Sequence, residues 1–397
     1  MQNYSSLCTK MVENSITTNI YLDYQASTPL DKRVLEEMLP YMTTEFGNPH
    51  SSEHSFGWKA NEAVEKAKET ISSYIDALSD EIIFTSGATE SNNLAIIGTG
   101  YAALEKSNRR TIIVSSIEHK CVLGAARFLE RFGFNIKKAP VLSDGKIDLS
   151  TFKELLNEDV LLVSVMATNN EIGVNQNLST IGDLCKKNGS IFHVDAAQGG
   201  YTNINVIDNN IDLMSLSAHK IYGPKGIGVL YINQMLKTKP LPIIHGGGQQ
   251  DGYRSGTLPV YLVVGIAKAI DIMSEIKEKE KESIGSLRNK LLEGLKNIVP
   301  ELRINGSMDN RHPGNINILI PNKDARQLIL SLQPNIAFST GSACTSGIQE
   351  PSHVLKAIGL STNEAEQSFR MTVGRFTTEE EINITLSLLK EKFTRTQ

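Results

Sequence analysis

The chain has few cysteines, and they form no motif. Its 397 residues include four of them, Cys8, Cys121, Cys185 and Cys344, which lie far apart. The spacing contains no Cys-x-x-Cys pair, so it disfavours both a zinc site and a disulfide framework. We therefore expect a cytoplasmic protein, in a reducing compartment, that binds no metal.

Long hydrophobic runs and a surplus of charge are also lacking. No stretch has the ~18 apolar residues that cross a membrane. Residues 1–19 lack the apolar core of a signal peptide, so we expect a polar tail. Lys and Arg number 40 against 44 Asp and Glu, and the basic residues are scattered. This balance disfavours direct nucleic-acid or membrane binding and favours a small-molecule site.

Short apolar runs alternate with helical patterns from about residue 80, which predicts an α/β fold with a mostly parallel sheet covered on both faces. The runs are EIIFTS (81–86), TIIVSS (111–116), LLVSVM (161–166), IFHVDA (191–196), LMSLSA (213–218) and GVLYI (228–232). Only the loop IYGPKG precedes the last run, and it is too short for a parallel crossover. That run is therefore expected to return antiparallel.

A charged helical segment, residues 271–298, separates this region from the C-terminal hundred or so residues. We expect it to link the α/β part to a second, smaller domain. In that domain NINILI (315–320) and IAFST (336–340) have the composition of strands. Helices near 352–358 and 378–392 complete a small α+β unit.

Polar clusters follow five of the predicted strands. They are SGATE, SSIEHK, ATNNE, HVDAAQ and SAHK. Ligands of open α/β sheets bind at the carboxyl ends of the strands, so the five clusters are expected to meet in one crevice. Gly87, Ala88 and Thr89 stand between a strand and a helix, where backbone amides can hold a phosphate. An ordinary Ser/Thr helix cap explains them equally well at this stage.

Asp195 and Lys220 each end an apolar strand. A carboxylate in that position needs a cationic partner, and a desolvated lysine can trap a carbonyl group. A plain salt bridge between the two is the simpler alternative. Together with the phosphate cradle, and with Ser217 and His219 before the lysine, they match the needs of pyridoxal phosphate. That cofactor takes a lysine for its aldehyde and an acid for its ring nitrogen.

Three further side chains suit the same cofactor. His119 can cover the ring, although a lone histidine is more often a satisfied surface residue. Asn170 and Gln198 can donate to the ring hydroxyl, or can be turn or capping residues.

Two loops and one arginine remain. STGSACTSG (339–347) places Cys344 among small residues, as a reactive thiol on a flexible loop would be. The Gly-rich stretch 245–257 is either a flexible connection or a functional loop. Arg370 suits a carboxylate ligand, or is a surface arginine.

These motifs together resemble the cysteine desulfurases of the class V aminotransferase group, in the branch of the NifS and IscS enzymes. The resemblance runs from about Ile20 to about Lys392. It is carried by YLDYQASTPLD, FGNPHS, FTSGATESNNLAI, EHKCVL, NNEIGVNQ, FHVDAAQ, SAHKIYGPKGIG, RSGTLPV, STGSACTSG, EPSHVL and GRFTTEEEI.

The resemblance implies a homodimer of pyridoxal phosphate subunits of fold type I. Each subunit would have a large domain, residues 31–274, with a mostly parallel seven-stranded sheet. Residues 20–30 and 275–397 would form the small α+β domain that carries the Cys344 loop.

The resemblance also assigns roles to the site residues. Lys220 would hold the cofactor covalently, Asp195 would face the ring nitrogen, and His119 would stack on the ring and move a proton. Asn170 and Gln198 would bind the ring hydroxyl, and the cofactor phosphate would be bound by Ala88, Thr89, Ser217 and His219. Thr257 would reach the phosphate of the neighbouring subunit. Arg370, with Asn170, would bind the substrate carboxylate, and Cys344 would accept the sulfur.

The implied activity converts L-cysteine to L-alanine and leaves the sulfur on Cys344 as a persulfide for an acceptor protein. Iron–sulfur cluster assembly and tRNA thiolation are candidate destinations. The chain ends in TRTQ soon after GRFTTEEEI, where iron–sulfur desulfurases usually continue with a docking tail. DNA phosphorothioation is therefore an alternative. A plain aminotransferase or epimerase, a selenocysteine lyase and an inactive scaffold are the other classes, and Cys344 and Lys220 argue against the plain aminotransferase and the scaffold.

Overall fold

The computed structural model describes residues 19–341 and 351–394. The strands are β1 (Ile20–Tyr21), β2 (Ile82–Thr85), β3 (Thr111–Ser115), β4 (Asn135–Ala139), β5 (Val160–Met166), β6 (Ile191–Asp195), β7 (Leu213–Ser217), β8 (Gly228–Ile232), β9 (Arg303–Ile304), β10 (Asn315–Leu319), β11 (Ile336–Ala337) and β12 (Ser368–Thr372). The α-helices are α2 (Lys32–Thr43), α3 (Ser55–Ile75), α4 (Ala88–Lys106), α5 (Lys120–Leu129), α6 (Leu149–Leu155), α7 (Leu178–Asn188), α8 (Val260–Ile298), α9 (Ala325–Ser331), α10 (His353–Ala357), α11 (Thr362–Glu366) and α12 (Glu379–Thr394).

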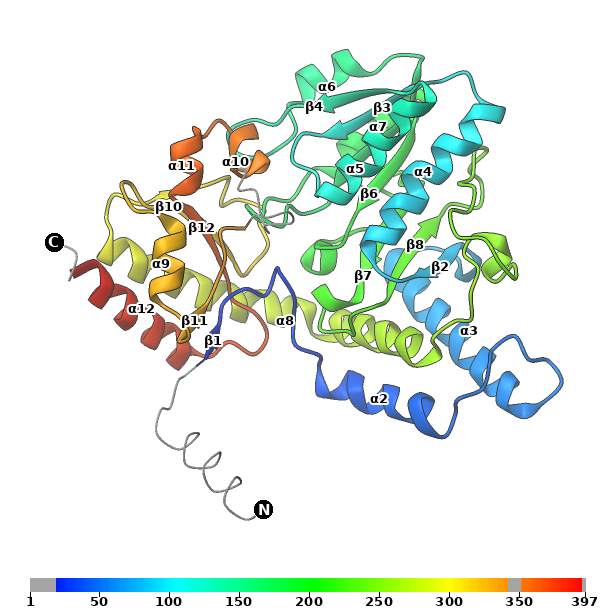
Figure 1. The fold of residues 1–397 in the computed structure, drawn as a ribbon, viewed down its shortest axis with the longest axis horizontal. Helices are drawn as coiled ribbons and strands as arrows, with labels where there is room; N and C mark the ends of the chain where they lie inside the picture. The colour runs from blue at the N-terminus through cyan, green and yellow to red at the C-terminus, as the bar shows by residue number, and fades with distance from the viewer. Residues whose placement is uncertain (1–18, 342–350, 395–397) are drawn as a thin grey trace, which may run out of the picture.

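A seven-stranded sheet forms the centre of the larger part of the molecule (Figure 1). Its strand order is β2-β8-β7-β6-β5-β3-β4. β8 pairs antiparallel with both neighbours, and the other pairs are parallel, so the expected fold and the expected reversal of GVLYI are confirmed. The edge strand β4 is not among the predicted apolar runs, because its sequence NIKKA carries two lysines that only an edge strand tolerates easily.

Helices cover both faces of this sheet (Figure 1). On β3, Ile113 belongs to a core cluster that includes side chains of α3, α6, α7 and α8. Its neighbours Ile112 and Val114 belong to a second cluster, with side chains of α4 and α5. The alternation follows from the two-residue period of a strand, which turns successive side chains to opposite faces.

The helix α8 connects this sheet to the smaller part of the chain. With 39 residues it is about 58 Å long, at about 1.5 Å per residue. The helix begins at Val260, earlier than the predicted Asp271. The sequence pattern missed its first residues, VYLVVGIAKAI, because they are almost all apolar and show no charged face. Ile270 packs in the core under the large sheet, whereas Ile284 and Leu295 pack in a separate core.

That separate core lies between α8 and a three-stranded antiparallel sheet of order β12-β10-β9. β1 pairs with β11 beside it. The apolar pattern does not predict β12, because this strand is fully buried yet polar, with Ser368, Arg370 and Thr372 among its five residues. The division at residue 275 falls within α8, and the two cores support it as a proposal for the domain boundary.

The N-terminal segment joins the two parts. After β1, the Thr28 amide donates to the His219 carbonyl, and the Tyr222 amide donates to the Thr28 hydroxyl. These bonds hold residues 25–31 against the turn that follows β7. Within the described ranges, no helix combines the length and the apolar character needed to cross a membrane.

Candidate active site

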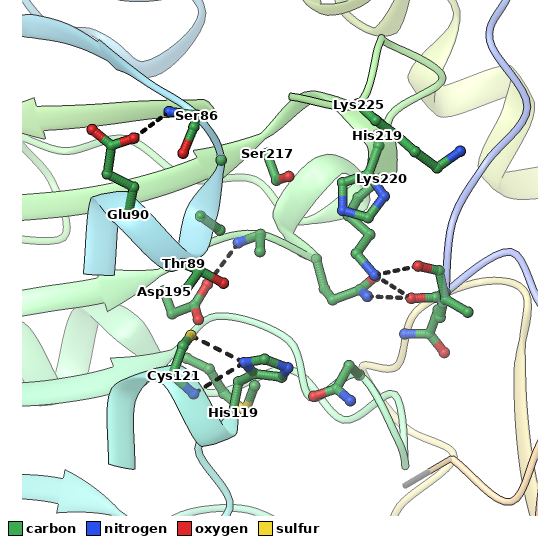
Figure 2. A pocket seen from close by; sticks show the side chains of 18 of the residues that line it. Ser86, Thr89, Glu90, His119, Cys121, Asp195, Ser217, His219, Lys220 and Lys225 are labelled. Atoms are coloured by element: carbon green, nitrogen blue, oxygen red, sulfur yellow. Dashed lines mark hydrogen bonds between the residues drawn. The ribbon is translucent and has the colours of Figure 1, made fainter. Parts of the chain in front are cut away.

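One cavity of about 510 Å³ opens at the carboxyl ends of the parallel strands (Figure 2). It gathers most of the side chains that the sequence singled out. They are Ala88, Thr89, His119, Asn170, Asp195, Gln198, Ser217, His219, Lys220 and Arg370. The convergence has the expected cause, since parallel strands end at the same edge of a sheet.

Two predicted site residues are not placed in this cavity, one because it lies elsewhere and one because it is not described. Thr257 is exposed and lies outside the lining. Cys344 falls outside the described residues, so its position is not assigned. Gly341, which precedes it by three residues, does line the cavity, with a positive φ of 88°.

Lys220 follows β7 in a short 3-10 turn and reaches across the cavity. Its Nζ donates to the carbonyl oxygens of Gln25 (2.7 Å) and Ala26 (2.8 Å). Burial, reinforced by the positive charge of Arg370, lowers the pKa of Lys220 to about 8. An amine with that pKa is neutral in about a tenth of molecules at pH 7, far more often than an ordinary lysine. It is therefore prepared to attack a carbonyl carbon.

Asp195 ends β6 and is fully enclosed. Its carboxylate accepts from Asn92 Nδ2 (2.8 Å) and from the Ala197 amide (3.0 Å). Burial raises the pKa of Asp195, and within residues 19–341 and 351–394 no lysine or arginine forms an ion pair with it. The simple salt bridge to Lys220 is thus wrong. A buried acid without a cationic side chain fits a protonated ring nitrogen, whose charge would favour the carboxylate form.

The phosphate cradle also passes a structural test. Helix α4 begins at Ala88, its N-cap is Gly87, and no side chain caps it. The Ser/Thr cap that could have explained these residues is absent at this helix end. Gly87 has a φ of 148°, a conformation that favours glycine. The next two residues, Ala88 and Thr89, line the cavity. Free amides at a positive helix end suit a phosphate.

His119 caps the next helix, α5. Its Nδ1 accepts from the Cys121 amide at 3.3 Å, which fixes the ring beside the cavity (Figure 2). Burial lowers the pKa of His119, which favours the neutral form of the ring at physiological pH. A neutral imidazole can cover an aromatic cofactor without repelling its ring nitrogen.

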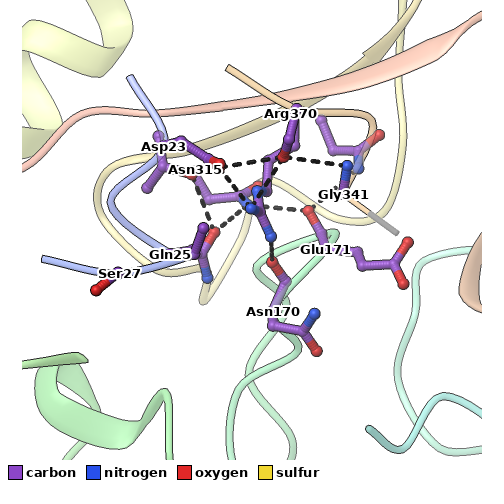
Figure 3. Close-up of polar contacts among 12 residues, drawn as sticks. Asp23, Gln25, Ser27, Asn170, Glu171, Asn315, Gly341 and Arg370 are labelled. Atoms are coloured by element: carbon purple, nitrogen blue, oxygen red, sulfur yellow. Dashed lines mark hydrogen bonds and ion pairs between the residues drawn. The ribbon is translucent and has the colours of Figure 1, made fainter. Parts of the chain in front are cut away.

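The opposite wall centres on Arg370, which is only 3% exposed, so the surface-arginine interpretation is wrong. Nη2 pairs with Asp23 Oδ1 (2.5 Å), and Nη1 donates to the Asn170 carbonyl (2.5 Å; Figure 3). Nη2 also donates to the Ser339 hydroxyl (3.0 Å). Within the part of the chain that the structure describes, the buried Nε has no hydrogen-bond partner. A fixed guanidinium with an unused donor suits a ligand carboxylate.

Several contributors to the site were not identified from the sequence. Asp23, Asn92 and Cys121 lie inside motifs that carried the resemblance, yet no role was given to them. The main-chain oxygen of Gln25 accepts from both Lys220 and Gln198 (2.8 Å). A backbone carbonyl leaves no mark in a sequence, so no pattern could have found it.

The fold and the cavity are those of a pyridoxal phosphate enzyme of fold type I, because a desolvated lysine, a buried acid and a helix-end cradle meet in one place. The model of the family "Aminotransferase class-V" matches residues 20–384. A cysteine desulfurase IscS of Rickettsia typhi is 49% identical over 379 residues, which cover 95% of this chain and 92% of that protein. The IscS enzyme of Rickettsia prowazekii is 48% identical over the same share.

Solved structures agree with this similarity. A NifS-like protein superposes with a TM-score of 0.88 at 35% identity, covering 95% of this chain and 99% of the other. SspA in complex with cysteine gives a TM-score of 0.80 at 38% identity, over 90% and 100% of the two chains. The chain therefore belongs to the cysteine desulfurase group of the class V aminotransferase family.

Proposed function

We infer that the chain is a pyridoxal phosphate-dependent cysteine desulfurase, which converts L-cysteine to L-alanine and receives the sulfur on Cys344. The observation that carries this inference is the pairing of two walls in one cavity. Lys220 and Asp195 form the wall that suits the cofactor, and Arg370 faces them from the wall that suits an amino-acid carboxylate. Gly341, at the start of the Cys344 loop, lines the same cavity.

The described residues divide the work between them. Bound pyridoxal phosphate supplies an electron sink for the charge that develops at the substrate Cα. Lys220 holds the cofactor, and its amine later accepts the Cα proton at Nζ. Asp195 holds a proton on the ring nitrogen, and Arg370 orients the substrate carboxylate.

Sulfur transfer needs a thiolate beside the substrate. Cys344 attacks the substrate sulfur, and the bond from that sulfur to Cβ breaks. Cβ then takes up a proton, and Cα takes back the proton held at Nζ of Lys220, which gives alanine. The sulfur stays on Cys344 as a persulfide. The other described cysteines suit this role poorly, because burial raises the pKa of Cys121 to about 12 and that of Cys185 well above its usual value.

Cys344→Ser tests the activity most directly. The variant should bind pyridoxal phosphate and respond spectrally to L-cysteine, yet release alanine several orders of magnitude more slowly, since a hydroxyl is a far weaker nucleophile. Cys185→Ser is the matched control and should turn over normally. Alanine release by Cys344→Ser at the normal rate would replace this proposal with an eliminating lyase.

A second test concerns the cofactor. Borohydride reduction of the holoenzyme followed by peptide mapping should place the pyridoxyl group on Lys220. A label on Lys225, which lines the same cavity, would refute the assignment.

We also propose a homodimer in which Thr257 of each subunit reaches the phosphate of the other. Thr257 is exposed and lies outside its own cavity. Large apolar side chains are exposed on α2, α3 and the loop between them, including Met42, Phe46 and Trp58 at 53%, 70% and 60%. Such a patch suits a subunit interface. Light scattering should give the mass of a dimer. Thr257→Ala should weaken cofactor retention and leave the dimer intact.

The acceptor of the sulfur is a separate proposal. Iron–sulfur cluster assembly or tRNA thiolation is our first candidate, because the IscS enzymes are about half identical over nearly the whole chain. DNA phosphorothioation is the alternative. Trapping the persulfidated enzyme with its partner, followed by mass spectrometry, distinguishes them.

A further inference from the structure

Cys121 occupies a position in the cavity that the proposed reaction does not use. Its Sγ lies 3.0 Å from Nδ1 of His119, and its amide donates to the same nitrogen at 3.3 Å (Figure 2). Two groups of one residue therefore face a single ring nitrogen. The thiol is also one of the cavity-lining groups.

The neighbours of the thiol determine which way its hydrogen points. Asn92 Nδ2 lies 3.2 Å from Sγ and 2.8 Å from Asp195 Oδ2, so the amide donates toward the sulfur. The thiol stays protonated, because burial raises the pKa of Cys121 to about 12. The Thr89 side chain also hydrogen-bonds the sulfur and, like Asn92, lowers the pKa of the thiol, as a donor does. With Asn92 and Thr89 as donors to the sulfur, the S–H can point at His119.

We propose that Cys121 is a positioning residue that fixes the tautomer of His119, by donating its S–H to Nδ1 so that the ring proton resides on Nε2. A proton on Nδ1 would point at the backbone N–H and at the S–H of Cys121. This repulsion between hydrogens disfavours both forms that carry a proton on Nδ1, namely the other neutral tautomer and the imidazolium. The inference deepens the proposed function, since it says which nitrogen of His119 holds the proton that the reaction can use.

Other charges act on His119 and must be held constant in any test. Asp195 on β6 favours its charged form, whereas Lys220, His353 on α10 and Lys120 on α5 disfavour it. A substitution of Cys121 leaves all four in place. A change in the titration of His119 then reports the loss of the Cys121 thiol together with its contact to Asn92.

The experiment compares Cys121→Ala, Cys121→Ser and Cys185→Ala as ¹⁵N-histidine-labelled holoenzymes by NMR. The His119 signals are assigned by their loss in His119→Gln. In the wild type we expect Nε2–H with an unprotonated Nδ1. The midpoint of His119 should rise in Cys121→Ala by about half a unit to one unit, the worth of one hydrogen bond to the neutral form. Cys121→Ser keeps a donor and should stay near the wild-type midpoint, as should Cys185→Ala.

The pH profile of kcat gives a second reading. If neutral His119 is the active form, the acid limb in Cys121→Ala moves to higher pH by the same shift, while Cys121→Ser restores it. Nδ1–H signals in the wild type, or an unchanged midpoint in Cys121→Ala, would overturn the proposal. The NMR measurement requires no turnover, so it stands apart from the test of the desulfurase activity by Cys344→Ser.

Discussion

The two walls of the cavity are built in different ways. The wall formed by the large sheet takes its groups from consecutive strand ends, with Asp195 as the last residue of β6 and Lys220 just after β7. The opposite wall takes Arg370 from β12 and pairs it with Asp23, 347 residues away in the chain. The first wall is a local consequence of the strand pattern, whereas the second exists only once the N-terminal segment and the small sheet have come together.

The walls also differ in how they make side chains reactive. The sheet wall works by desolvation, which raises the pKa of Asp195 and lowers that of Lys220. The Arg370 wall works by orientation, because three hydrogen-bond partners hold the guanidinium in place and this group is always charged. Substitutions in the sheet wall should therefore affect chemistry, and substitutions in the Arg370 wall should affect substrate binding.

Asp195→Asn should produce the largest loss in this comparison. It keeps the shape of the side chain and removes the charge that holds a proton on the ring nitrogen, so kcat should fall on the order of 100-fold or more. Steady-state kinetics with L-cysteine measure the loss. A kcat equal to that of the wild type would remove Asp195 from the chemistry.

Arg370→Lys should instead raise KM by about 10- to 100-fold, the worth of one charge-assisted hydrogen bond, with a smaller effect on kcat. An ammonium cannot reproduce a two-bond grip on a carboxylate. The matched control is Arg303→Lys, which changes an arginine paired with Glu364; neither of these residues lines the cavity. If KM were unchanged and kcat fell, the division of labour between the walls would be wrong.

The pKa of Lys220 predicts a pH dependence for cofactor capture by the apoenzyme. The neutral amine is the nucleophile, so the rate should level off above pH 8 and fall about tenfold for each unit below it. Stopped-flow absorbance after mixing with pyridoxal phosphate measures this rate. Free Nα-acetyl-lysine provides the reference and should level off only above pH 10. A coincident profile for the two would mean that the cavity does not desolvate Lys220.

Gln198→Ala should have the smallest effect. Its Nε2 donates to the Gln25 carbonyl that also accepts from Lys220, so the residue links the two walls. Loss of one neutral hydrogen bond should weaken cofactor retention by about three- to tenfold and leave KM for L-cysteine nearly unchanged. Equilibrium dialysis of the cofactor measures it, and a loss as large as that of Asp195→Asn would show that Gln198 does more than link the walls.

Local sequence pattern was enough to predict the large sheet and its functional edge. Apolar runs of strand length, spaced by helices, predicted six of the seven strands, and polar residues after those runs placed His119, Asp195 and Lys220 at one edge. This worked because the period of a strand and the common edge of parallel strands are local rules. β4 failed the rule because an edge strand needs no apolar sequence.

The other features of the site depend on tertiary packing. Whether Arg370 lies on the surface or beneath it depends on the pairing of β12 with β10, and that polar strand has no apolar pattern. Lys220 does not pair with Asp195 because its amine donates to the carbonyls of Gln25 and Ala26, which precede it by 195 and 194 residues in the chain. Burial and long-range hydrogen bonding set the pKa of each group, and both depend on the packed fold rather than on neighbours in sequence.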